Sequence, residues 1–153
     1  MARFLALLPL LAACSAPDPV VTRAAVDNGM RLHVAAIVGV SAAILTLDLG
    51  YADGTEDRVN VLAFGGSYGW QADLTLSFPS GPMTVPPGLH ERDLAGWYSG
   101  PWWGGALVFG IRKEDVTNGA GVKIRTSGPA IGVAAASAEE LLFVIRLGSA
   151  DDS

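Results

Sequence analysis

The sequence predicts a mostly β domain, a small antiparallel barrel or sandwich of seven to nine short strands that follows a cleaved signal peptide. Two observations lead to this prediction. Apolar and polar residues alternate in one segment after another, as they do in strands with one buried face. Glycine, proline, asparagine and aspartate separate these segments at close intervals, which is typical of small β domains. A chain of 153 residues that is 50% hydrophobic can bury a single core.

Charge and cysteine content exclude several function classes. The chain has 10 basic and 15 acidic residues, a net charge of −5, and basic residues that are scattered along its length. This balance argues against nucleic acid as a partner. The single cysteine excludes an internal disulfide. With two histidines and no second thiol, we expect no metal site and no cofactor.

The first residues look like a targeting signal rather than a part of the fold. Arg3 is followed by an apolar run over residues 4–11, far shorter than the roughly 20 residues of a membrane-spanning helix. The run ends in Leu11-Ala12-Ala13-Cys14, which resembles the lipobox of bacterial lipoproteins. The alternative is an ordinary secretory signal that happens to contain a cysteine.

The lipobox resemblance implies that residues 1–13 are removed and that the thiol of Cys14 takes a diacylglycerol, with palmitate or a similar acyl chain. Two or three acyl chains on one residue make a stable membrane anchor. Ser15 follows where an aspartate would favour the inner membrane, so in a Gram-negative cell we expect the outer membrane, facing the periplasm. The rest of the chain then divides into three segments. Residues 14–27 form the lipidated N-terminus and tether, residues 28–148 form the β domain, and residues 149–153 form an acidic tail.

The first half of the domain predicts strands joined by tight turns. Residues 30–34 alternate as a half-buried strand does. Residues 34–47 carry no charge, but this stretch is too short for a membrane helix, and we expect buried strands joined near Gly39. Residues 45–51 alternate again, and Asp53-Gly54 predicts the turn of a β-hairpin.

The middle of the chain contains the clearest strand. Gly65-Gly66-Ser67 predicts a break, and residues 70–78 then alternate without exception. Its apolar face consists of Trp70, Ala72, Leu74, Leu76 and Phe78. The proline-rich residues 79–88 predict a loop, and residues 89–94 one helical turn.

The last third predicts further short strands. They cover residues 104–111, 122–126 and 131–136, separated by a solvated turn at Asn118-Gly119 and a break at Gly128-Pro129. Residues 138–147 are ambiguous. Ser137 and Glu140 fit the capping box of a helix, whereas the alternation that follows and the β-branched residues fit a strand, which we favour.

Few residues suggest chemistry. The compact titratable cluster His90-Glu91-Arg92-Asp93 would need an opposing partner, and a solvated loop is the simpler interpretation. His33 lies on the polar side of its strand, where exposure or a hydrogen bond is expected. Gly66-Ser67 lacks the spacing of a hydrolase nucleophile elbow, and the sequence places no histidine to serve it. We therefore expect no catalytic residues and no enzymatic activity.

A small basic patch or a solvated hairpin is expected at Arg112, Lys113, Lys123 and Arg125.

Large aromatic residues gather in one glycine-rich segment, residues 96–105. Its rings belong to Trp97, Tyr98, Trp102 and Trp103, which are the candidate contacts to a ligand or a membrane. The alternative is that these rings close the end of the barrel core.

Three short motifs are similar to a family of small periplasmic β-barrels of alphaproteobacteria that is linked to envelope integrity. They are Leu49-Gly50-Tyr51-Ala52-Asp53-Gly54, Gly65-Gly66-Ser67-Tyr68-Gly69-Trp70, and Ile124-Arg125-Thr126 before Gly128 and Gly132. The resemblance implies a barrel, and it carries over no catalytic residues.

These observations favour a membrane-anchored cell-envelope lipoprotein with a non-enzymatic structural or binding β domain. Its expected partners are membrane lipid, through an acylated Cys14, and an apolar ligand or an envelope protein. The first alternative is a binder or carrier of a lipid or other apolar ligand, with a cavity opening at residues 97–103. The second is a small hydrolase, which requires residues 90–93 to converge in a cleft.

Overall fold

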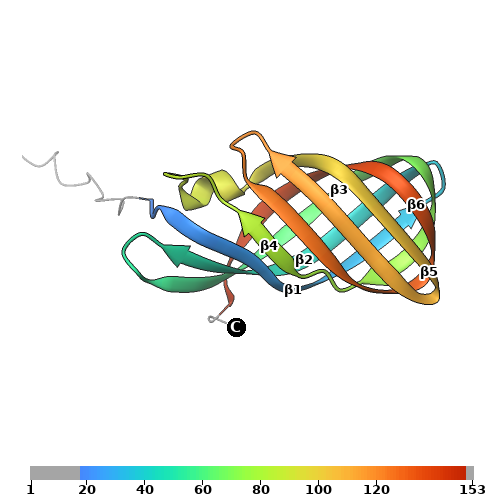
Figure 1. Ribbon diagram of the computed structural model, residues 1–153, viewed down its shortest axis with the longest axis horizontal. Helices are drawn as coiled ribbons and strands as arrows, with labels where there is room; N and C mark the ends of the chain where they lie inside the picture. Colours follow the sequence, from blue (N-terminus) through green and yellow to red (C-terminus); the bar gives the residue numbers. More distant parts are fainter. Residues whose placement is uncertain (1–17, 151–153) are drawn as a thin grey trace, which may run out of the picture.

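The protein is a single antiparallel β-barrel in the computed structural model, which describes residues 18–150 (Figure 1). Its strands are β1 (Val21–Ala35), β2 (Val38–Tyr51), β3 (Glu56–Ser77), β4 (Gly81–Thr84), β5 (Gly96–Asn118) and β6 (Lys123–Ser149), with one 3₁₀ turn, η1 (Glu91–Leu94). The predicted mostly β fold is confirmed. The described chain forms six strands rather than seven to nine, because β3, β5 and β6 run through several of the expected breaks.

Pairing along both edges of the strands closes the barrel. β1 pairs with β2 on one edge and with β3 and β4 on the other, and β6 joins β3 and β4 to β5. β5 then folds back on itself near Val108, which has a φ of 73°. The backbones of its two halves touch there, since a Cβ on Gly110 would lie 1.8 Å from the carbonyl oxygen of Gly105. This close approach requires glycine and gives the free edge of β5 a partner.

Several expected elements are confirmed. β2 and β3 form the hairpin whose turn contains Asp53-Gly54. The ambiguous residues 138–147 lie within β6 and form a strand, and η1 supplies the helical turn expected within residues 89–94.

Other expected boundaries differ. The sheet begins at Val21, so residues 21–27, assigned to the tether, belong to β1. The turn between β1 and β2 lies at Ala36-Ile37 instead of Gly39, and β4 forms inside the proline-rich loop. Gly65-Gly66-Ser67 does not break β3, because its pairing with β6 continues through these residues, and Gly128-Pro129 likewise lies within β6. Among residues 18–150 no helix is long and apolar enough to cross a membrane.

One end of the barrel, which we call the core end, has the usual arrangement of a water-soluble protein. The chain enters here beside η1 (Figure 1). Its interior is an apolar cluster that includes Leu45, Leu47, Val59 and Val144. Outward charges at this end form ion pairs, among them Arg58–Asp48 at 3.0 Å and Lys123–Asp115 at 3.1 Å.

The opposite end, which we call the inverted end, has apolar residues outside and polar residues inside. The turns at Ala36-Ile37 and Leu107-Val108 lie at this end (Figure 1). On the clearest predicted strand, Leu74 is 62% exposed, whereas Asp73 and Thr75 are buried. The apolar side chains of residues 70–78 and of residues 30–34 therefore point outward, opposite to the usual arrangement of a half-buried strand in a soluble protein. Alternation fixes which residues share a face, and it does not fix which face is inside.

Candidate functional site: an apolar belt around a buried polar cluster

Large apolar side chains surround the inverted end on its outer surface. We call this set the apolar belt. It consists of Met30, Leu32, Val34, Ile37, Val38, Val40, Ile44, Phe64, Tyr68, Trp70, Leu74, Phe78, Trp103, Leu107, Val108, Phe109, Ile111, Ile131, Val133 and Leu141. These residues come from β1, β2, β3, β5 and β6 and from the turns, so the belt covers the circumference and not a single face. The exposed fraction reaches 82% at Leu107 and 77% at Ile37.

Charge is nearly absent from this outer surface. Within residues 30–44, 64–78, 99–113 and 131–141, only Lys113 and Glu139 are charged residues with exposed side chains. The other acidic residues and arginines of these segments point into the barrel. Monomeric soluble proteins rarely expose contiguous apolar patches of more than a few hundred Å². The belt is therefore an unusual surface for a monomeric soluble protein.

The dimensions of the belt are smaller than those of a barrel that crosses a bilayer. On β2 it extends from Val38 to Ile44, which is about 20 Å along the strand at about 3.3 Å per residue. A membrane-crossing strand needs about 9–11 residues. The residues of the two turns at this end, Ala36-Ile37 and Leu107-Val108, are themselves apolar. This geometry suits insertion into one side of a bilayer.

The interior of the inverted end holds a cluster of buried charges. The guanidinium of Arg31 bonds to Glu114 and lies 3.0 Å from Glu140. Arg112 lies 2.8 Å from Glu140 and stacks on the ring of Trp102 at 3.7 Å. Ser41 donates a hydrogen bond of 2.7 Å to Glu140. These side chains are shielded from water and neutralise one another, as buried ionised groups must.

His33, Ser67 and Asp73 lie next to this charge cluster. The Nε2 atom of His33 is 2.9 Å from Ser67 Oγ, and its Nδ1 atom is 3.0 Å from Asp73 Oδ2. The imidazole packs edge-on against Trp102 with ring centroids 4.7 Å apart. The three side chains are almost completely buried, which agrees with the hydrogen-bonded alternative expected for His33.

Sequence reasoning missed this arrangement because His33 and Ser67 come from strands on either side of β2. His33 pairs with Ser41 of β2, and Gly39 of β2 pairs with Ser67 of β3. The available signal was that His33 and Asp73 both occupy polar positions of alternating segments. Their register, which brings them together, follows only from the closed barrel.

No protein-family model, curated protein or solved structure matches this chain. Cys14, the expected lipidation site, lies outside the described residues.

The four candidate aromatic residues divide into two pairs. They lie on β5 and not in a loop, and they alternate in direction. Tyr98 and Trp102 are buried inside the barrel, where Tyr98 donates a hydrogen bond to the carbonyl oxygen of Leu94. Trp97 and Trp103 are exposed on the outside. A contact to a ligand or a membrane stays a prediction for this outward pair.

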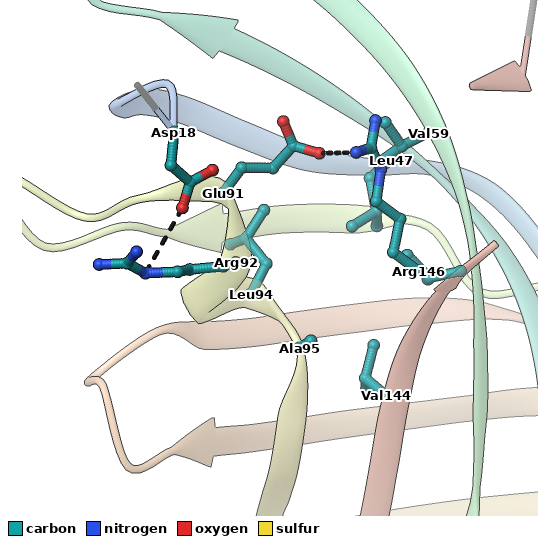
Figure 2. Close-up of a pocket in the computed structure, with 10 residues that line it drawn as sticks. Asp18, Leu47, Val59, Glu91, Arg92, Leu94, Ala95, Val144 and Arg146 are labelled. Atoms are coloured by element: carbon teal, nitrogen blue, oxygen red, sulfur yellow. Dashed lines mark ion pairs between the residues drawn. The ribbon is translucent and has the colours of Figure 1, made fainter. Parts of the chain in front are cut away.

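The cluster at residues 90–93 does not converge on one cleft. His90 Nδ1 contacts the carbonyl oxygen of Asp18 at 2.8 Å, and Asp93 accepts a hydrogen bond from the backbone of His90. Only Glu91 and Arg92 of the four line a pocket at the core end (Figure 2).

The pocket at the core end is small and has a charged rim. Ion pairs join Glu91 to Arg146 at 2.9 Å and Arg92 to Asp18 at 3.4 Å, as Figure 2 shows. Burial and the hydrogen bond to Glu91 raise the pKa of Tyr51 beside this rim. The cavity volume is about 200 Å³. Because ligand sites usually measure about 300–1,000 Å³, this pocket suits at most a small group. Its lining includes none of residues 97–103, where the expected ligand cavity would open.

The four basic residues of the expected patch do not form one. β5 and β6 pair as a hairpin here, but Arg112 points into the barrel and is 5% exposed. Lys123 and Arg125 both pair with Asp115 at 3.1 Å. Lys113 stays outside, away from Arg112, because adjacent residues of a strand face opposite sides.

Proposed function

We propose that this chain is a cell-envelope membrane protein whose β-barrel inserts its inverted end into the lipid bilayer. One observation carries the proposal: the barrel is inside-out at this end, with an apolar belt around its circumference and paired charges in its interior. Barrels that face lipid have apolar residues outside and a polar interior. A protein partner would cover one face of the belt, whereas lipid covers all of it.

The core end would remain in water. Its outward residues are charged and paired, and its apolar residues are inside. Insertion from one side explains the outer surfaces of both ends, since the inverted end would then face lipid and the core end would face water. The role that fits this design is structural, a barrel held at the surface of an envelope membrane.

Lipidation of Cys14 forms a separate part of the proposal. Cys14 lies outside the described residues, and the apolar belt does not include it. A Cys14→Ser variant therefore tests the belt by itself.

The test is flotation of purified Cys14→Ser protein with phosphatidylcholine vesicles on a density gradient. We expect the protein to float with the vesicles and to resist extraction by 1 M salt, a concentration at which surface charge interactions are screened to about 3 Å. A barrel that stays at the bottom of the gradient, folded and monomeric, would contradict the proposal.

A further inference from the structure

We propose that Ser67, His33 and Asp73 form an acyl-transfer site, with Ser67 as the nucleophile and the acyl ester of a lipid as the substrate. The serine, histidine and aspartate meet in the atom order that nucleophilic catalysis requires. Ser67 Oγ faces His33 Nε2 at 2.9 Å, and His33 Nδ1 faces Asp73 Oδ2 at 3.0 Å. In this order the histidine can take the serine proton, and the carboxylate beside Nδ1 can stabilise the positive charge of the ring.

The surroundings hold each of the three side chains in place. Thr75 donates a hydrogen bond of 2.6 Å to Asp73, and Arg112 lies 3.7 Å from the same carboxylate. Trp102 packs against the edge of the imidazole and so limits its rotation. Fixed side chains of this kind are what a catalytic relay needs, because small misplacements of reacting groups reduce rates strongly.

Gly39 keeps space beside the two atoms that would exchange the proton. A Cβ at this position would lie 2.6 Å from Ser67 Oγ and 3.0 Å from His33 Nε2. A side chain here would therefore displace the serine or the imidazole.

Gln71 lies between Ser67 and the β1–β2 turn at the inverted end. Its Oε1 atom accepts a hydrogen bond of 2.9 Å from Ser67, and its Nε2 atom donates one of 2.8 Å to the carbonyl oxygen of Ile37. Ser67 Oγ thus has two hydrogen-bond partners at equal distance, His33 Nε2 and Gln71 Oε1. When Gln71 moves away, His33 is left as the acceptor and the β1–β2 turn loses a contact that fastens it over the site.

The position of this turn identifies the substrate class. Ile37 and Val38 are more than 70% exposed at the inverted end. The choice of a lipid ester, though not the relay itself, rests on the proposed insertion of this end into lipid. Acyl esters would be the reactive groups at highest concentration next to the turn.

Besides the lipid ester, the reaction needs only water as a reactant. Ser67 Oγ forms a bond to the acyl carbonyl carbon as its proton passes to His33 Nε2. The ester C–O bond breaks, and the alcohol leaves with that proton. Water then attacks the acyl-serine, again giving its proton to His33, which returns it to Ser67 as the carboxylic acid is released. The Asp73 carboxylate lies 3.0 Å from His33 Nδ1, where it stabilises the positive charge of the ring.

A long-chain alkyl fluorophosphonate tests this proposal on the full chain inserted in phosphatidylcholine vesicles. The probe forms a Ser–O–P bond and loses fluoride, so intact mass and peptide mapping report the modified residue. We expect one adduct, at Ser67, and faster labelling in Gln71→Ala. In His33→Ala we expect labelling slowed by roughly 10²–10⁴-fold, the usual contribution of a general base.

Control variants separate chemistry from folding and from membrane insertion. Ser41→Ala removes another buried serine, one that bonds to Glu140 instead of a histidine, and should leave labelling unchanged. If His33→Ala fails to fold, Asp73→Asn replaces it, with far-UV circular dichroism as the check. The catalytic proposal would be overturned if Ser67 stays unmodified in both the wild type and Gln71→Ala, although both proteins are folded and float with the vesicles. That result would leave the proposed membrane insertion intact.

Discussion

Leu74→Arg is expected to reduce binding to phosphatidylcholine vesicles by roughly 30- to 700-fold and to leave folding unchanged. Leu74 is 62% exposed on the apolar belt. An arginine on the lipid face of a barrel costs about 2–4 kcal/mol near the middle of a bilayer, and each 1.4 kcal/mol is tenfold in affinity. In water the same substitution on an exposed side chain changes stability by about 0.5 kcal/mol or less.

The matched control is Thr117→Arg, which places the same charge on an exposed position of β5 at the core end. Vesicle titration followed by flotation measures both variants beside the unsubstituted barrel. Equal affinities for Leu74→Arg and Thr117→Arg would show that the belt does not contact lipid.

Arg31→Met is expected to lower the free energy of unfolding by about 3–5 kcal/mol, the usual cost of removing one partner from a buried ion pair. Arg31 is 2% exposed and contacts both Glu114 and Glu140. Its loss leaves two carboxylates inside the barrel with Arg112 as the nearest guanidinium. Chemical denaturation followed by circular dichroism gives the magnitude.

Two further variants define the cause of this loss. Arg23→Met breaks the exposed ion pair with Glu56 and should cost no more than about 1 kcal/mol. Arg31→Met combined with Glu114→Leu removes one charge of each sign, and we expect it to recover much of the stability. If Arg31→Met costs no more than Arg23→Met, the buried cluster does not hold the inverted end together.

The sequence was sufficient for the fold class and for much of the strand pattern. Alternation over residues 45–51 and 70–78 reflects strands, and Asp53-Gly54 marks a hairpin turn, because these signals depend on local backbone geometry. Glycine was a poorer guide. Gly65-Gly66-Ser67 suggested a break, but in the barrel these residues allow close approach of β3 to β6: a Cβ on Gly65 would lie 1.8 Å from the carbonyl oxygen of Leu141.

The direction in which each face points could not be derived locally. Residues 45–49 and 70–78 have the same alternating pattern, yet Leu47 is buried and Leu74 is exposed. The difference comes from the interior, where Arg31, Arg112 and Glu140 need one another as partners. These residues are far apart in sequence, so neither their pairing nor the contact between His33 and Ser67 is visible before the barrel closes.

The depth of two labelled positions in a bilayer tests the central claim most directly. In a Cys14→Ser background, Leu107→Cys and Thr117→Cys each carry one nitrobenzoxadiazole label, at the inverted end and the core end of the same strand. We expect brominated phosphatidylcholine to quench the label at position 107 and aqueous iodide to quench the label at position 117. Quenching of both labels by iodide, with neither affected by brominated lipid, would contradict membrane insertion of the inverted end.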